Sequence, residues 1–258
     1  MNSTLEILNR RKSVRAYSSQ PVTDEEKDLI LKAAFRAPTA GNMMLYAIIE
    51  VQDQSLKDRL AETCDHQPFI ARAPYVLLFL ADYQRWYDYF NYCGVEPRSR
   101  ELALPYRTPQ VGDLLLTCCD TLIAAQTAVI AAESLGIGSC YIGDILEQYE
   151  IHRELFNLPP YTLPITLVCF GHPASLGEPA NPAPRFDRKY IVHKNTYRRF
   201  NSEEMEDMFR VTRERYYANG KYPGGAQNVG QAYFFRKFVS GFSIEMTRSV
   251  KEMLKNWE

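Results

Sequence analysis

The sequence predicts a central β-sheet flanked by helices, and three short apolar runs are the first reason. Residues 47–51, 75–81 and 165–170 are rich in β-branched and aromatic side chains, and polar residues or prolines bound each run, as expected of buried strands. Helical patterns lie between these runs, and hairpin signals are few. Helices between strands favour a sheet covered by helices over a sandwich or a barrel.

The helix before the first strand has the clearest start signal. Thr23 and Glu26 stand three residues apart, as in a capping box, and apolar residues follow at positions 29, 30, 33 and 34. We expect this helix to end before Pro38, because proline disfavours a helical conformation in the residue that precedes it. The spacing therefore predicts a helix that begins after Thr23.

A longer helix over residues 113–135 is apolar almost all round, and Gly136 follows it as a C-cap. Such a helix must be buried on several sides, either in one core or partly by a second subunit, and the sequence leaves both alternatives open. Charged amphipathic residues predict a helix over 203–217, and a last helix runs from about 236 to 257. Aromatic residues at positions 83, 86, 87 and 90 also keep helical spacing, which favours a packing face over a substrate contact.

Composition and charge narrow the class of protein. With 258 residues, 46% of them hydrophobic and 12% aromatic, the chain has the composition of a globular protein with a sizeable core. Its 30 Lys and Arg nearly balance 31 Asp and Glu, so no basic excess supports binding to nucleic acid. Residues 1–10 lack the apolar centre of a signal peptide, and Asp120, Gln126 and Glu133 interrupt the longest apolar region. We therefore expect a cytoplasmic protein without a membrane partner.

The cysteines and histidines give no sign of a metal site. Six cysteines are present without a CxxC motif, and the four histidines are scattered without a pair at metal-binding spacing. The sequence therefore predicts reduced, mostly buried thiols and no metal ligands.

The stretch Arg-Lys-Ser-Val-Arg-Ala-Tyr at residues 11–17 is the most informative part of the chain. It places the cations of Arg11, Lys12 and Arg15 around the hydroxyl of Ser13. Arginine can bind a phosphate with two hydrogen bonds and serine can donate to its oxygens, so the cluster could hold a phosphate or an electron-rich ring. Taken alone, the stretch fits a solvated helix end or a nonspecific basic patch better.

Read together with Ala-Pro-Thr-Ala-Gly-Asn at 37–42 and Gly-Ser-Cys-Tyr-Ile-Gly-Asp at 138–144, the stretch gives the chain a family resemblance. The chain resembles the nitroreductase family, in the branch of NADPH flavin oxidoreductases and major oxygen-insensitive nitroreductases that carry a long C-terminal extension. Residues 131–136 and 191–197 match as well. The order and separation of these motifs carry the resemblance, which covers about residues 5 to 200.

The resemblance implies an α+β fold with a mostly antiparallel central sheet flanked by helices, in an intertwined homodimer with one FMN at each of two interface sites. Residues 1–200 would form the FMN-binding core. Residues 201–258 would form a helical extension that could act as a lid over nucleotide or substrate.

The resemblance also assigns roles to the cationic stretch. Arg11 and Ser13 would contact the FMN phosphate and ribityl chain, and Arg15 would lie near the flavin N1 and the C2 carbonyl. A fixed positive charge there would stabilise the anionic reduced flavin. Lys12 could add to this field.

A second group of residues would surround the flavin ring. Pro38, Thr39 and Ala40 match a segment that reaches FMN from the opposite subunit, although an ordinary turn would also explain them. Asn42 and Gln67 match flavin-contacting positions, and the Gln67 amide can offer both a donor and an acceptor to the pyrimidine edge.

The segment after the long helix would meet the ring from its other side. Tyr141, Ile142, Gly143 and Asp144 match the loop whose backbone meets the dimethylbenzene-to-N5 side of the flavin. Gly143 would let a main-chain N–H approach N5, although a plain β-turn is the alternative.

Two later cations complete the expected site. Arg185 matches the arginine that closes the phosphate site, but Ala183 stands where this branch often has a lysine, and Arg188 or Lys189 could compensate. In the Gly-rich loop at 219–228, Lys221 is the one cation that could pair with the 2′-phosphate of NADPH.

The function that follows is an FMN-dependent NAD(P)H oxidoreductase, with NADPH or NADH as electron donor. It would work by a ping-pong mechanism, passing hydride through the flavin to a nitroaromatic, a quinone or free flavin. No catalytic side chain is required, because FMN carries the chemistry. The alternatives are a flavin-binding storage or redox-sensing protein without efficient turnover, and a basic-patched interaction domain without flavin.

Overall fold

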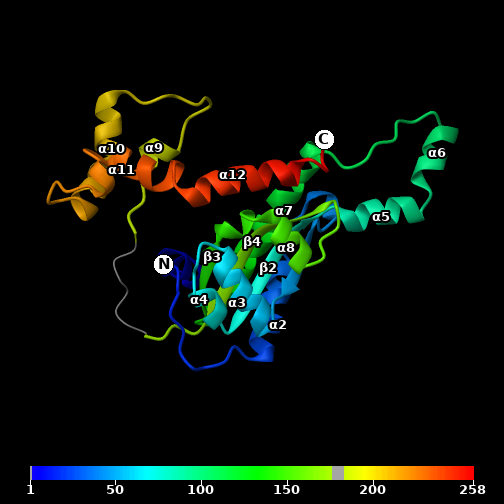
Figure 1. Cartoon of the computed structure of the whole chain (residues 1–258), viewed down its shortest axis with the longest axis horizontal. Helices are drawn as coiled ribbons and strands as arrows, with labels where there is room; N and C mark the ends of the chain where they lie inside the picture. Colours follow the sequence, from blue (N-terminus) through cyan, green and yellow to red (C-terminus); the bar gives the residue numbers. More distant parts are fainter. Residues whose placement is uncertain (1, 176–182) are drawn as a thin grey trace. The chain divides into compact units, whose positions relative to one another are not determined.

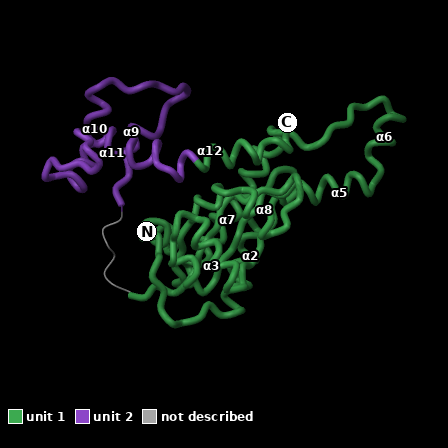
Figure 2. Tube along the Cα trace, viewed as in Figure 1, with its two compact units in different colours: residues 1–178, 245–258 green, residues 179–244 purple. Residues whose placement is uncertain are grey.

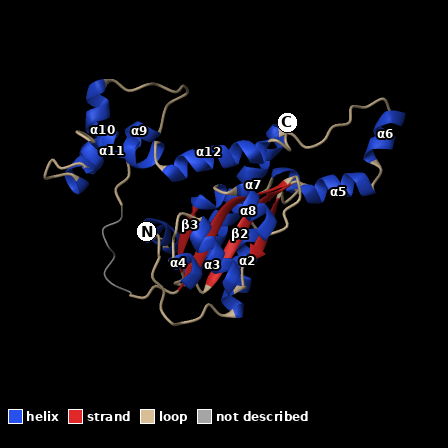
Figure 3. Ribbon diagram, in the orientation of Figure 1, coloured by secondary structure: helices blue, strands red, loops and turns tan. Residues whose placement is uncertain are grey.

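Four strands form an antiparallel sheet in the computed structural model, which describes residues 2–175 and 183–258. The strand order is β1-β2-β4-β3, and each neighbouring pair is antiparallel. Figure 3 shows the strands in red among the helices. The strands are β1 (Tyr46–Glu50), β2 (Tyr75–Asp82), β3 (Gly138–Ile142) and β4 (Thr162–Gly171). The predicted sheet and its three predicted strands are confirmed.

Strand β3 is the one that the sequence did not reveal, and its last two residues belong to the segment 141–144 that was expected to form a loop. It begins with glycine and spans five residues, so its own strand signal is weak. Pairing with β4 supplies what the local sequence lacks, with Gly138 opposite Gly171 and Ile142 opposite Leu167.

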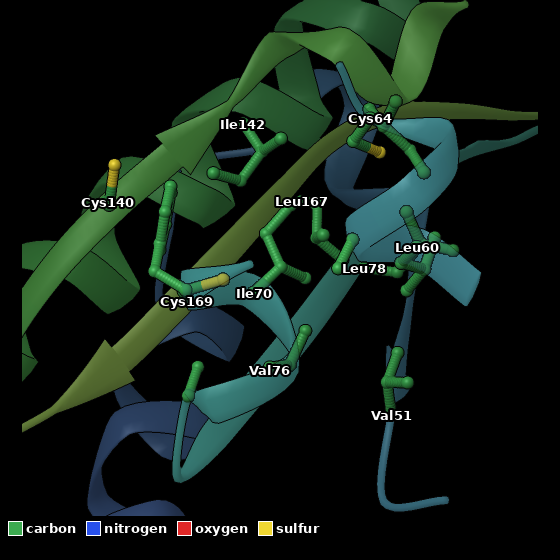
Figure 4. Close-up of a cluster of buried hydrophobic side chains, with 14 of the residues drawn as sticks. Val51, Leu60, Cys64, Ile70, Val76, Leu78, Cys140, Ile142, Leu167 and Cys169 are labelled. Atoms are coloured by element: carbon green, nitrogen blue, oxygen red, sulfur yellow. The ribbon is translucent and has the colours of Figure 1, made fainter. Parts of the chain in front are cut away.

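Each face of the sheet has its own layer of helices. On one face, α2 (Asp24–Phe35) and α7 (Val111–Ser134) bury small and branched side chains against alternate residues of β2 and β4. On the other, α3 (Gln54–Thr63) and α4 (Phe69–Arg72) pack on the remaining residues (Figure 4). Strand β2 is buried along its whole length, as expected of a strand covered on both sides.

The two helices on the first face of the sheet, α2 and α7, were predicted from the sequence and are confirmed. Thr23 caps α2 in a capping box with Glu26, as its spacing predicts. Helix α7 is long and apolar enough to cross a membrane by length and composition, yet here it packs on the sheet as a core helix. Its other side is uncovered in the single chain, where five large apolar residues are exposed: Val111, Leu115, Leu116, Leu122 and Ile123.

Short helices complete this part of the chain. They are α1 (Ser3–Arg10), the 3₁₀ turn η1 (Ala40–Asn42), α5 (Gln84–Tyr92), α6 (Val95–Glu101), the 3₁₀ turn η2 (Gly143–Leu146) and α8 (Tyr149–Leu155). The aromatic positions at helical spacing on α5 are partly buried, and Tyr87 packs against Tyr161 with ring centroids 5.0 Å apart. Tyr89 and Tyr92 on the same helix are exposed, so the aromatic residues of α5 form a packing face only in part.

The chain divides into two compact units (Figures 1 and 2). The first comprises residues 1–178 and 245–258, and the second comprises residues 179–244. The second contains α9 (Arg188–Ile191), α10 (Ser202–Tyr216), the 3₁₀ turn η3 (Pro223–Gly225), α11 (Val229–Tyr233) and a π-helical turn η4 (Phe234–Phe238). Helix α10 confirms the charged helix predicted over 203–217.

The last helix, α12 (Gly241–Leu254), is shorter than predicted, because the π-helical turn and a break at Val239 and Ser240 precede it. Its C-terminal part belongs to the first unit, where Trp257 is fully buried and Arg248 forms an ion pair with Glu150 at 2.7 Å. The compact units thus divide the chain at other positions than residue 200, and the division into a cofactor core and a lid stays a prediction.

Candidate functional site

The cationic stretch lies along the edge of the sheet next to β3. Ser13 forms a parallel bridge with Ser139, and the N–H of Val14 donates to the Ser139 carbonyl at 2.9 Å. Farther along, the N–H of Ser18 donates to the His172 carbonyl at 2.8 Å. These bonds fix the backbone on both sides of Arg15 as if it were an additional strand.

Two glycines make this close approach possible. Gly138 and Gly171 face each other in the β3–β4 register. A Cβ on Gly138 would lie 2.8 Å from the Val14 Cβ, and one on Gly171 would lie 2.6 Å from a ring carbon of Tyr17. Only glycine at these positions therefore lets Val14 and Tyr17 lie flat on the sheet edge.

The side chains of this stretch are available to a ligand. Lys12, Ser13 and Arg15 are exposed and Arg11 is half-buried, and within the described ranges no carboxylate forms an ion pair with the three cations. The Arg15 guanidinium stands 5.7 Å from the ring centroid of buried Phe69 on α4. The stretch therefore presents positive charge that the protein itself does not neutralise, which suits a bound anion.

The cations of the stretch act to lower the pKa values of two neighbouring groups. Burial raises the pKa of the Glu133 carboxyl, at the end of α7, while the nearby Arg11 acts in the opposite direction. Burial likewise raises the pKa of the Cys140 thiol, and Arg15 opposes that shift. Glu133 belongs to α7 and Cys140 to the core under α4, so the positive charge of the stretch reaches groups on both sides of β3.

Gln67 and Asp144 are brought into direct contact, although 77 positions separate them in the chain. The Gln67 Nε2 donates to the Asp144 Oδ2 at 2.7 Å and to the Cys64 carbonyl at 2.9 Å. Both amide hydrogens are thus used within the protein, and only Oε1 is left for a ligand. In this arrangement the amide offers only its oxygen to a ligand, and the flavin contact expected of Gln67 stays a prediction.

Asp144 also faces a buried carboxyl group that the sequence analysis missed. Glu147 follows it by three residues, is 5% exposed, and has an Oε1 atom without a hydrogen-bond partner. Burial, followed by the negative charges of Asp144, Asp65 and Glu245, raises the pKa of Glu147 to about 7. The Asp-x-x-Glu spacing directly after Gly143 was the available signal, since a 3₁₀ turn brings positions i and i+3 together.

The residues from Tyr141 to Gly143 have less freedom than a loop would give them. Tyr141 and Ile142 are the last residues of β3, and Gly143 opens η2. The Ile142 side chain is buried in the core (Figure 4), so only its backbone could meet a ligand. The Tyr141 hydroxyl lies 3.2 Å from the Gln126 Oε1, while Gly143 is exposed.

The segment from Pro38 to Asn42 is anchored on one buried carboxylate, Asp120 of α7. Asp120 accepts hydrogen bonds from the Thr39 hydroxyl, from the Ala40 N–H at 3.0 Å and from the Leu45 N–H at 3.3 Å. Pro38, Gly41 and Asn42 remain exposed, and Gly41 and Asn42 have left-handed backbones. In the sequence, Asp120 stood out only as an interruption of the apolar run.

The two groups of predicted site residues lie at different places on the sheet. Pro38–Asn42 precede β1 at one outer strand, whereas the cationic stretch borders β3 at the other. Along α7, Asp120 and Glu133 mark these two places, and 13 residues of helix span about 20 Å. One chain therefore keeps the two groups apart, and they cannot contact the same flavin ring within it.

The two remaining predicted residues belong to the second unit. The Arg185 guanidinium donates to the carbonyls of Ala183 and Pro184 at 2.9 and 3.3 Å. The Lys189 Nζ forms an ion pair with the Asp207 Oδ2 at 2.7 Å. Lys189 is therefore less available to replace the lysine that relatives often have at the position of Ala183. Lys221 is exposed in its Gly-rich loop, and the roles of Arg185 and Lys221 stay predictions.

Comparison with known proteins defines the class first. The fold is nitroreductase-like: the NfrA1 nitroreductase of Bacillus subtilis matches with a TM-score of 0.79 and 26% identity, over 99% of this chain and 100% of that one. The nitroreductase family model matches residues 8–172, and the chain belongs to this family.

Among curated relatives, an FMN reductase [NAD(P)H] of B. subtilis is 32% identical over 80% of this chain and 78% of its own length. An oxygen-insensitive NADPH nitroreductase of Salmonella typhimurium is 33% identical over 76% of this chain and 75% of its own.

Proposed function

We propose that this protein is an FMN-dependent NAD(P)H oxidoreductase that reduces nitroaromatics, quinones or free flavin by two-electron transfer. One observation carries the proposal: Arg11, Lys12 and Arg15 lie beside β3 without an ion pair to any carboxylate of the described residues. Family membership and the names of the relatives support the same reaction class.

The residues at this edge fit the chemistry of FMN. A phosphate needs cations and hydroxyl donors, which Arg11, Lys12 and Ser13 provide. A flavin ring needs polar partners along its pyrimidine edge, and the Gln67 Oε1 atom is free to accept there. Exposed Gly143 at the end of β3 allows backbone to approach a planar ring without a Cβ in the way.

In the proposed mechanism the protein orients the bound flavin and supplies a positive charge beside it. Bound FMN would supply the hydride chemistry, accepting from the nicotinamide and donating to the second substrate. Arg15 holds a positive charge that offsets the negative charge arising on reduction. Phe69 limits where that guanidinium can lie, since its ring stands under the cation and is buried. The substrates are small molecules, and the exposed position of the cationic stretch gives them access.

We further infer that the active form is a homodimer in which each site takes residues from both subunits. The support is the separation of about 20 Å along α7 between the cationic stretch and Pro38–Asn42. A two-fold axis would place the turn of one subunit against the cationic stretch of its partner. The exposed leucines and isoleucine of α7 give such a dimer an apolar contact surface.

The extension and the localisation complete the proposal. Residues 201–258 would contribute a lid over the nicotinamide nucleotide, with Lys221 near its 2′-phosphate. We expect the protein to act in the cytoplasm, where its six free cysteines would stay reduced.

The visible spectrum of the purified protein tests the proposed reaction. Recorded anaerobically, it should show bound FMN that is bleached by NADPH or by NADH. A flavin spectrum that neither nucleotide changes would favour a storage or redox-sensing protein, and a protein that stays colourless after FMN is added would reject the flavin function.

A further inference from the structure

We propose that Asp144 is a positioning residue that fixes the Gln67 amide with only its oxygen facing the flavin, so that the site selects a ring edge with an N–H donor. The inference rests on the proposed FMN function and concerns the chemical group that the site requires. Its basis is the pair of hydrogen bonds that use both amide hydrogens of Gln67.

The chemistry of the partners settles which way the amide points. The Cys64 carbonyl oxygen can only accept a hydrogen bond, and so can an ionised Asp144 carboxylate. A reversed amide would place the Gln67 Oε1 against these two oxygens and leave all three atoms without a donor. The nitrogen must therefore face Cys64 and Asp144, and the oxygen must face outward.

The backbone of Gln67 is fixed as firmly as its side chain. Asp65 and His66, directly before it, both have left-handed backbones. The Gln67 N–H donates to the Ala61 carbonyl at 2.8 Å, and its own carbonyl accepts from the Ile70 N–H at 3.1 Å. Both the backbone and the terminal amide of Gln67 are held by hydrogen bonds, so the side chain loses little conformational entropy when a ligand binds.

Asp144 is held in turn from within η2. The Glu147 N–H donates to the Asp144 carbonyl at 3.0 Å, and the buried Glu147 carboxyl faces the Asp144 carboxylate. The other charged and titratable groups around Glu147 are Asp65, the Cys64 thiol, Glu245 and the buried His152. Arg248 forms an ion pair with Glu245 at 2.8 Å. A protonated Glu147 can donate to one oxygen of the Asp144 carboxylate, while Oδ2 accepts from Gln67.

The outward oxygen determines which ligand edge fits. The pyrimidine edge of a flavin carries an N3–H between two carbonyl groups. The N3–H can donate to the Gln67 oxygen, whereas either carbonyl in its place would be repelled. Asp144 thus sets the register of the ring through Gln67 without touching it.

The test compares the dissociation constants of FMN and of 3-methyl-FMN, which lacks the N3–H, by fluorescence titration. Wild-type protein should bind FMN about tenfold more tightly, the value of one good hydrogen bond. In Asp144→Ala the amide keeps only the Cys64 carbonyl as a partner and is held less firmly, so the preference should fall to a few-fold. Asp144→Asn should restore it, because the Asn oxygen can still accept from Gln67.

A matched control comes from the chain itself. Gln54 donates to Asp58 at 2.8 Å in a second Asp–Gln pair, on the surface of α3. Asp58→Ala should leave the preference at its wild-type value.

The outcomes separate the inference from the proposed function. A tenfold preference that persists in Asp144→Ala would show that the methyl group is rejected by its size alone, and would overturn the role of Asp144. A wild-type protein that binds neither flavin would instead reject the FMN function. Thermal melts of the apoproteins show whether each variant folds. If Asp144→Ala does not fold, Glu147→Gln replaces it as the test. A Glu147→Gln protein that binds FMN normally but changes the pH dependence of the preference supports the contacts from Glu147 through Asp144 to Gln67, and an unchanged pH dependence contradicts them.

Discussion

Two places along α7, near Asp120 and near Glu133, support opposite kinds of structure. At Asp120 the turn of residues 38–45 is tied down by hydrogen bonds to one buried carboxylate. Near Glu133 the cationic stretch has a fixed backbone, and its charged side chains form no ion pair with the part of the chain that the structure describes. The first arrangement presents a rigid surface and the second leaves charge available for a ligand. If the dimer proposal holds, each cofactor is held between one region of each kind.

The largest loss of stability should come from removing the Asp120 carboxylate, which anchors the turn of residues 38–45. Asp120→Ala leaves the Thr39 hydroxyl and the N–H groups of Ala40 and Leu45 without their acceptor, so the free energy of unfolding should fall by about 3 kcal/mol or more. Urea denaturation measures the change. Asp120→Asn keeps one oxygen and should lose less; equal losses in the two variants would contradict the anchoring role.

A smaller loss should follow from pushing the cationic stretch off the sheet edge. Gly138→Ala places a Cβ against Val14, which should cost about 1–3 kcal/mol of stability and weaken FMN binding at the same time. Gly112→Ala is the matched control, since nothing lies within 4 Å of its Cβ. FMN affinity that survives Gly138→Ala unchanged would show that the stretch need not lie on β3.

The buried carboxyl group of Glu147 predicts that the free energy of unfolding depends on pH. The pKa of Glu147 is raised to about 7 in the folded state, so the folded protein holds a proton that the unfolded chain releases near the ordinary glutamate pKa. This group therefore costs stability in full above pH 7, and the cost disappears below the ordinary pKa. Glu147→Gln should raise the free energy of unfolding by about 1–2 kcal/mol at pH 8 and change it little at pH 4.5. A gain of the same size at both pH values would contradict the shifted pKa.

Arg15→Ala should leave the fold intact while it changes the bound flavin. Loss of the fixed positive charge should lower the flavin reduction potential by about 30 mV and slow its reduction by nicotinamide nucleotide. Arg36→Ala, which removes an exposed cation after α2, serves as the control. An unchanged potential in Arg15→Ala would remove the role given to this residue.

The smallest effect concerns the second unit. Lys221→Ala should lower the ratio of kcat/KM for NADPH to that for NADH by about two- to fivefold, if Lys221 pairs with the 2′-phosphate in an exposed loop. Steady-state kinetics with both nucleotides measure the ratio. If the ratio does not move, this lysine does not contact the phosphate.

Much of the fold followed from local sequence signals, and the differences have physical causes. The capping box at Thr23, the apolar helix before Gly136 and three strands were predictable, because each carries its own periodicity or cap. Strand β3 was not, since its five residues gain their conformation from pairing with β4. The π-helical turn before α12 had no local signal either.

For the site, the sequence identified the residue types better than their partners. Pairs such as Gln67 with Asp144, or Thr39 with Asp120, join positions about 80 residues apart, which no local pattern encodes. Glu147 was overlooked because a lone glutamate in a chain is usually solvated. Burial turned it into a candidate partner of Asp144.

The most direct test of the account is a mixed dimer. One subunit carries Arg11→Ala and Arg15→Ala, and the other carries Pro38→Glu, which places bulk and charge at an exposed position of the turn. Sites shared between subunits predict one FMN per mixed dimer, because one of its two sites combines an intact cationic stretch with an intact turn. Each parent homodimer should bind little FMN. A mixed dimer that binds none, or a wild-type protein that binds FMN as a monomer, would contradict the shared site.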